Sequence, residues 1–204
     1  MRSERRLFVA SVLVLQALMT RGLQAEELLV ERVLAAVNET PVLLSDVRLL
    51  AALRGLEPQA ALEAAIDERL MFQEAVRLSQ SAISATEEQA AYESLQTRAG
   101  SVSLAEPGLR RLARVEATIL RYVEFRFRPQ VRVADDAVRA AYELEAQSLA
   151  SPPSFEERAP ALRARIEQQA LDERLEAWIR ELRTSGDVRK VDGIGGIAGT
   201  GQES

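Results

Sequence analysis

Residues 58–79 read PQAALEAAIDERLMFQEAVRLS and predict a long helix. Its apolar residues fall on two sides at helical spacing, with Leu62, Ile66, Leu70, Phe72 and Val76 on one and Met71, Ala75 and Leu78 on the other. A surface helix carries one apolar stripe, whereas a helix that is apolar on two faces packs between neighbours. The segment, called the central helix below, is therefore predicted to pack between neighbours in a mostly α fold.

A small β-hairpin and a short helix are predicted before the central helix. Two short apolar runs between Arg32 and Leu44 flank the turn-forming residues 38–41. Ser45 follows as the expected N-cap, because its hydroxyl can accept a hydrogen bond from a free amide at a helix start. The sequence then predicts a helix from Asp46 to Arg54.

Further helices are predicted between the central helix and residue 146. Ser84 and Glu87 form the S-x-x-E pattern of a capping box, in which two side chains satisfy each other's free backbone amides. The expected succession is a helix from Thr86 to Ala99, a loop from Gly100 to Gly108, a long helix ending before Pro129 and a helix from Asp135 or Asp136 to about Ala146.

The last helix is predicted to begin at a second capping box. Residues 151–153 (Ser-Pro-Pro) break the chain, and Ser154 with Glu157 then repeats the S-x-x-E pattern. The helix should extend to about Arg183, with Pro160 either kinking it or marking its true first turn.

The two halves of this last helix carry different apolar stripes. Leu162 and Ile166 point away from the stripe formed by Leu171, Leu175, Trp178 and Leu182. We therefore expect the halves to meet different partners, and the second half to pack on the N-terminal helices. Residues 187–192 are expected to form one short strand, and residues 193–204 a disordered tail.

The composition excludes several classes of chemistry. The 204-residue chain has no cysteine and no histidine, which removes thiol nucleophiles, disulfides, the usual zinc sites and triads with an imidazole base. We expect no metal, no cofactor and no enzyme activity, although paired carboxylates could in principle run acid–base chemistry. The formal net charge of −5 argues against nucleic acid as a partner, because such binding depends on neutralised phosphates.

The first 25 residues have the layout of a signal peptide. Arg2, Arg5 and Arg6 precede an apolar run of 13 residues, 7–19, which is shorter than the roughly 20 residues of a membrane-spanning helix. We predict cleavage after Ala25 and export to the periplasm.

Three stretches of the sequence, taken together, are similar to segments of one protein family. The hairpin reads VLAAVN at residues 33–38 and VLLSD at 42–46, and the central helix reads AIDERLMFQEA at 65–75, followed by Ile83-Ser84 and Glu87-Glu88. The third stretch is the last helix and strand, residues 165–192, with Trp178, Leu182, Arg183, Val188, Val191 and Asp192. Together these segments resemble the N-terminal module and the closing C-terminal helix of the SurA family of periplasmic chaperones.

The resemblance implies a SurA-N-like helical chaperone module at residues 26–153, and a C-terminal helix and strand at residues 154–192 that pack back on it. Family members usually carry one or two parvulin-type prolyl isomerase domains between these parts, and such a domain needs roughly a hundred residues. Only a short linker separates Glu143 from Phe155, so no isomerase activity is expected.

The function implied by the resemblance is that of an ATP-independent holdase, which binds unfolded exported or outer-membrane proteins. The alternative is a structural or adaptor subunit of a cell-envelope complex with one fixed partner. A degenerate foldase with residual isomerase activity rests on family analogy alone.

Four side chains are candidates for client binding: Met71, Phe72, Tyr122 and Phe125. Flexible methionine and aromatic surface suit a site that must adapt to different unfolded polypeptides. Core packing is the competing interpretation of each.

An arginine-rich segment runs from Arg110 to Arg132 and contains seven arginines against two glutamates. It is either a solvated helix face or a surface that attracts acidic clients or, transiently, anionic lipid headgroups.

We predict that the exported protein begins at Glu26. Its intact mass after purification from the periplasm should lack residues 1–25, because the apolar run is too short for a permanent anchor. A full-length chain that stays with the membranes after a carbonate wash would instead identify residues 7–19 as an anchor.

Overall fold

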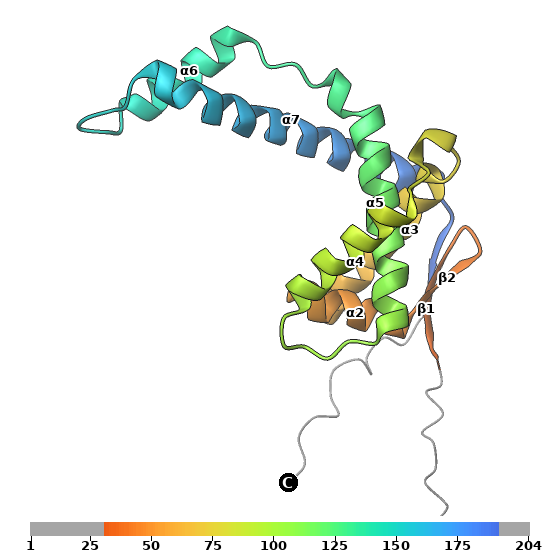
Figure 1. Ribbon diagram of the computed structural model, residues 1–204. Helices are drawn as coiled ribbons and strands as arrows, with labels where there is room; N and C mark the ends of the chain where they lie inside the picture. Colours follow the sequence, from red (N-terminus) through yellow and green to blue (C-terminus); the bar gives the residue numbers. More distant parts are fainter. Residues whose placement is uncertain (1–30, 192–204) are drawn as a thin grey trace, which may run out of the picture. The chain divides into compact units, whose positions relative to one another are not determined.

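A three-stranded antiparallel sheet joins the two ends of the described chain. The computed structural model describes residues 31–191, whose arrangement is shown in Figure 1. Strand β1 (Val33–Val37) lies between β2 (Thr40–Leu43) and β3 (Val188–Lys190). In the turn between β1 and β2, Asn38 has a φ of 46°, which asparagine tolerates better than most residues. The predicted hairpin and the predicted C-terminal strand are thus both confirmed.

Helices make up most of the rest of residues 31–191. They are α2 (Leu44–Arg54), α3 (Pro58–Ala75), α4 (Ala85–Ala99), α5 (Glu106–Arg126), α6 (Asp135–Ala146) and α7 (Phe155–Ser185), with short 3-10 turns η1 (Ser79–Ser81) and η2 (Arg128–Gln130). This arrangement is the predicted fold class, mostly α with a small hairpin and a C-terminal strand. No helix in this part of the chain is long and apolar enough to cross a membrane. The expected signal segment, residues 1–25, and the expected tail, residues 193–204, lie outside the described residues.

Helix α3 packs between several neighbours, as its two apolar faces predict. It contacts α2, α5, α7 and both strands of the hairpin. Leu62 and Ile66 are fully buried in the main core with the hairpin and α2, whereas Ala75 belongs to a second cluster with α5 and α7. The helix is shorter than predicted: the amides of Arg77 and Leu78 bond to carbonyls three residues back, which tightens the last turn and ends the helix.

Both predicted capping boxes are present. The amide of Glu87 donates to Ser84 Oγ at 3.2 Å, and the amide of Glu157 donates to Ser154 Oγ at 3.3 Å. Each glutamate also accepts a hydrogen bond from the backbone amide of its serine. Since α7 begins just after Ser154, Pro160 lies inside the helix and does not mark its first turn.

Two predicted helix starts are wrong. The N-cap of α2 is Leu43, not Ser45, because the amide of Leu44 is already satisfied by the carbonyl of Arg32 at 2.8 Å, so that the hairpin runs directly into the helix. The loop expected up to Gly108 is also shorter, since α5 begins at Glu106 with Pro107 in its first turn. Proline fits there because the amide it lacks has no partner within the helix at that position.

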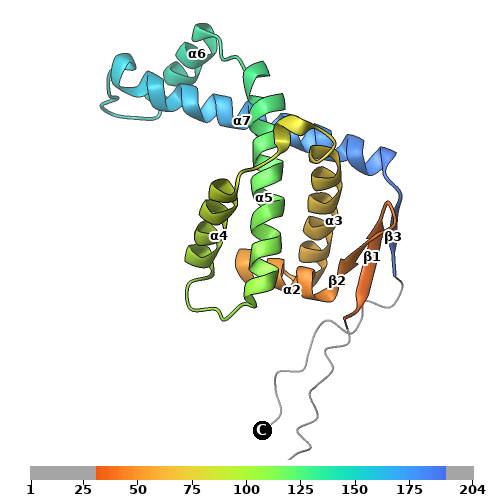
Figure 2. The ribbon, with the colours of Figure 1, turned by 45° about the vertical axis from the view of Figure 1, so that its right-hand side comes forward.

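The two halves of α7 meet different partners, as the divided stripe predicts. The first half pairs with α6, where Val138 and Leu162 are the buried residues (Figure 1). The second half crosses α3 and α5 (Figure 2). There the ring of Trp178 stacks on Tyr122, with the centroids 4.9 Å apart and the planes 11° apart.

A polar cluster fixes the corner between α7 and β3. Asn38 Oδ1 accepts from the amide of Asp187 at 2.8 Å, and Asn38 Nδ2 donates to Gln73 Oε1 of α3 at 2.8 Å. The chain turns at Gly186, where an added Cβ would lie 2.7 Å from Leu70 Cδ2 and 2.9 Å from the carbonyl oxygen of Leu182. The absence of a side chain at this position lets the end of α7 approach α3 closely.

We predict that Trp178→Ala lowers the free energy of unfolding by about 3–5 kcal/mol, the range for truncating a large buried aromatic residue. Trp178 is 7% exposed and also lies against Phe127, with ring centroids 5.2 Å apart. Urea unfolding monitored by circular dichroism measures the loss, with the exposed Glu176→Ala on the same helix as control. A fragment ending at Pro153 that unfolds at the same urea midpoint as the longer chain would contradict this account of α7.

Candidate functional site

An open groove lies in the angle between α3, α5 and α7. Its volume is about 540 Å3. Its apolar lining consists of Ala64, Met71, Ile119, Leu120, Val123, Leu171, Leu175 and Ile179. Its polar lining consists of Arg54, Asp67, Glu68, Glu116, Glu124, Arg128 and Gln168. The size falls within the range of about 300–1,000 Å3 for ligand pockets, and the combination of an apolar floor with charged residues is typical of binding sites.

Helix α7 supplies one wall of the groove. Leu171, Leu175 and Ile179 are spaced four residues apart and therefore lie along one face of the helix. Leu171 is also buried in the cluster that holds Trp178 and Tyr122. The wall is thus anchored to the same core that fixes the direction of α7.

Helix α5 supplies the most exposed apolar side chain of the groove. Leu120 is 59% exposed, beside the half-buried Ile119 and the buried Val123. An apolar side chain exposed beside an apolar concave surface favours binding of another apolar group, because association removes both surfaces from water. The groove therefore suits an apolar segment of a polypeptide.

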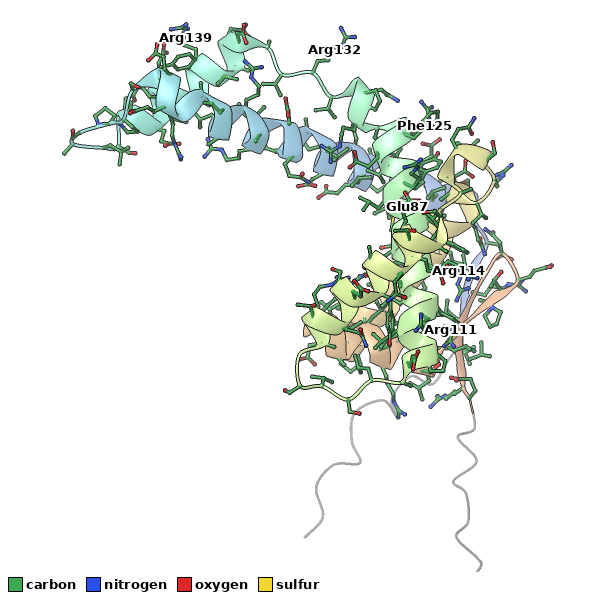
Figure 3. The ribbon with its side chains drawn as sticks, in the orientation of Figure 1. Glu87, Arg111, Arg114, Phe125, Arg132 and Arg139 are labelled. Atoms are coloured by element: carbon green, nitrogen blue, oxygen red, sulfur yellow. The ribbon has the colours of Figure 1, made fainter. Side chains whose placement is uncertain are left out.

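The structure separates the four sequence-predicted client-binding residues. Met71 lines the groove. Phe72 is half-buried and lines a smaller pocket of about 110 Å3 between α2, α3 and α5. Tyr122 is 4% exposed and stacks beneath Trp178, so it belongs to the core and offers no surface to a client. Phe125 is 52% exposed but does not line the groove; Figure 3 shows it on α5.

Sequence reasoning missed two of the main groove residues. Leu120 lies beside Ile119 but off the apolar stripe that Leu112, Val115, Ile119 and Val123 form at helical spacing, and that off-stripe position was the available signal. Leu175 was recognised as part of an apolar stripe and interpreted as core, whereas it is half-buried and lines the groove.

A series of ion pairs with alternating charges links four helices, and three of its members line the groove. Arg54 of α2 donates to Glu68 of α3 and to Glu116 of α5, the latter at 3.0 Å. Glu116 also accepts from Arg98 of α4. Among residues 31–191, no three histidine, cysteine, aspartate or glutamate side chains gather into a group able to hold a metal ion.

Glu68 is the most deeply buried carboxylate of this series of ion pairs, with an exposed fraction of 9%. Burial raises the pKa of Glu68 above its ordinary value, because the charged form is poorly solvated, although the neighbouring Arg54 guanidinium acts in the opposite direction. Arg54 stays protonated at any physiological pH. The ion pair therefore orients α2 against α3 beside the groove at some cost in desolvation.

The arginine-rich segment from Arg110 to Arg132, which spans most of α5 and the chain just after it, is largely engaged in ion pairs. Five of its seven arginines pair with carboxylates, as Arg110–Glu106, Arg111–Asp46, Arg114–Glu88, Arg121–Glu87 and Arg128–Glu124. Figure 3 shows Arg111 and Arg114 on α5, with Glu87 on the adjacent α4. These pairs offset much of the positive charge, which favours a solvated helix face over a surface that attracts acidic partners.

We predict that Glu68→Gln flattens the pH dependence of stability. A carboxyl whose pKa is raised by folding stabilises the fold below the pKa of the unfolded chain, about 4.3, and this contribution is lost as the pH rises through the folded pKa. Glutamine does not ionise, so the urea midpoint of the wild type should fall relative to that of the variant as the pH rises from about 4 through the folded pKa of Glu68. Glu74→Gln, which removes an exposed pair with Arg77 on the same helix, is the control for loss of a glutamate ion pair. If the urea midpoints of Glu68→Gln and wild type change equally with pH, the pKa of the Glu68 carboxyl is not raised in the folded protein.

No protein-family model matches the chain, and no curated protein matches it.

Proposed function

We propose that the protein is an ATP-independent chaperone that binds unfolded or partly folded exported polypeptides in the groove between α3, α5 and α7. The observation that carries this proposal is the open apolar groove, whose lining combines the exposed Leu120 with the α7 stripe Leu171, Leu175 and Ile179. Such a groove can bury apolar side chains of a client without any covalent chemistry.

The make-up of the groove supports binding of varied rather than uniform sequences. Met71 contributes an unbranched, flexible side chain that can repack around differently shaped groups. The other apolar residues of the lining are aliphatic, so no aromatic ring of the lining can select clients by stacking. A holdase needs this tolerance because its clients share only exposed apolar surface.

The proposed place of action is the periplasm. The basic residues and the short apolar run of residues 1–25 support export, and the resemblance of residues 33–46 and 65–75 to the SurA family supports a role in folding of exported proteins. Isomerase activity is not part of the proposal, because the linker between α6 and α7 spans only residues 147–154.

A second candidate function is that of an adaptor in an envelope complex. The specific observation in its favour is apolar surface at the far end of the α6–α7 pair, where Leu144 is 72% exposed and Leu149 45% exposed. One fixed partner could cover these two leucines. Breadth of binding separates the functions: a pull-down from periplasm should recover many exported proteins with a chaperone and one stoichiometric partner with an adaptor.

We predict that the protein suppresses aggregation of an unfolded outer-membrane protein and that Leu120→Gln weakens this suppression. Leu120 is 59% exposed, so the substitution removes groove surface with little effect on folding. Light scattering at increasing chaperone concentration measures the effect. Val102→Gln is the matched control, because Val102 is 49% exposed in the connection between α4 and α5, outside the groove lining.

The same assay contains the results that would count against the proposal. Unchanged aggregation at several-fold excess of the wild type would remove the holdase function. Equal loss with Leu120→Gln and Val102→Gln would place client binding elsewhere on the surface. Acceleration of a proline-limited refolding reaction would overturn the expectation that the protein is not an isomerase.

A further inference from the structure

More negatively than positively charged side chains line the groove. Its carboxylates are Asp67, Glu68, Glu116 and Glu124, whereas its guanidinium groups are Arg54 and Arg128. The lining therefore has an excess of negative charge around an apolar floor.

The arrangement of ion pairs places part of the compensating positive charge outside the groove. Asp67 pairs with Arg183 and Glu116 pairs with Arg98, yet neither of these arginines belongs to the lining. Within the lining, Arg128 pairs with Glu124, and the single guanidinium of Arg54 is shared between Glu68 and Glu116. Negative groups consequently face the groove while two of their partners approach from other sides.

We propose that the groove selects apolar polypeptide segments that carry lysine or arginine next to their apolar residues. This inference rests on the proposed function and specifies the chemistry of the client. Charge complementarity supports it, since a bound apolar segment displaces water from the groove and thereby strengthens the attraction between its cation and the lining carboxylates. A segment with aspartate or glutamate at the same positions would meet repulsion.

Lysine and arginine also fit the shape of such a lining. Their aliphatic stems can cover apolar surface such as Leu120 and Ile119, while a charged head can share the partly exposed carboxylate of Glu124 with its partner Arg128. Glu124 is the most accessible of the groove carboxylates that form ion pairs, with a side chain 39% exposed. It is therefore the residue through which selection for a basic segment is best tested.

The test compares three labelled synthetic peptides that share the same leucine and alanine positions and differ only in two residues, which are both lysine, both glutamine or both glutamate. Fluorescence anisotropy with the full-length protein measures their dissociation constants. We expect the lysine peptide to bind about three- to tenfold more tightly than the glutamate peptide at low ionic strength, as expected for a few partly exposed charge contacts. The difference should shrink as salt screens these contacts.

Two matched variants locate the effect. Glu124→Gln should reduce the preference for lysine about two- to threefold, because it removes one groove carboxylate. Glu106→Gln removes a glutamate of the same helix that pairs with Arg110 at the same spacing, outside the groove lining, and should leave the preference unchanged. Circular dichroism checks that both variants are folded.

The outcomes distinguish this inference from the function on which it rests. Equal affinity for the three peptides would overturn the selection for basic segments and leave the chaperone proposal standing. No binding of any peptide would remove both. An equal reduction by Glu124→Gln and Glu106→Gln would show that the preference comes from the net negative charge of the whole protein, and would overturn its assignment to the groove.

Discussion

The contact between Trp178 and Tyr122 is the interaction on which the rest of the structure depends. It holds the second half of α7 across α3 and α5, although the two rings are far apart in the sequence. The direction of α7 then decides three further features. It brings β3 beside β1 through Gly186, it carries the first half of α7 away to pair with α6, and it leaves the groove in the angle between the helices.

Ion pairs contribute orientation more than stability. Arg54 is held between Glu68 and Glu116, and Arg183 of α7 binds Glu63 and Asp67 of α3. Partly exposed pairs of this kind contribute roughly 0–1 kcal/mol each, far less than the burial of a tryptophan. Their directional hydrogen bonds nevertheless fix the rotation of α2 and α7 about α3. The same pairs set the charge at the groove, so the residues that align the helices also shape what the groove can bind.

The groove keeps apolar surface in contact with water, which is unfavourable for the isolated protein. The fold tolerates this because each wall is anchored behind its exposed face. Leu171 and Val123 are buried in the cluster around Trp178, while Leu175 and Leu120 extend from the same helices into the groove. Rigid walls lose little conformational entropy on binding, which suits weak and varied ligands. The proposed chaperone function uses the surface that the core leaves uncovered.

The sequence by itself determined the local structure: the two-faced α3, the hairpin, both capping boxes and the division of α7 into halves all follow from periodicity and from side chains close in sequence. It also excluded thiol and imidazole chemistry, since the chain has no cysteine or histidine. Only the tertiary structure decided which apolar residues form the groove. Met71 and Leu120 reach it, Tyr122 is buried and Phe125 lies elsewhere on α5. The reason is that periodicity places a residue on a face of its helix, whereas its exposure depends on which distant helix covers that face, and here that helix is α7.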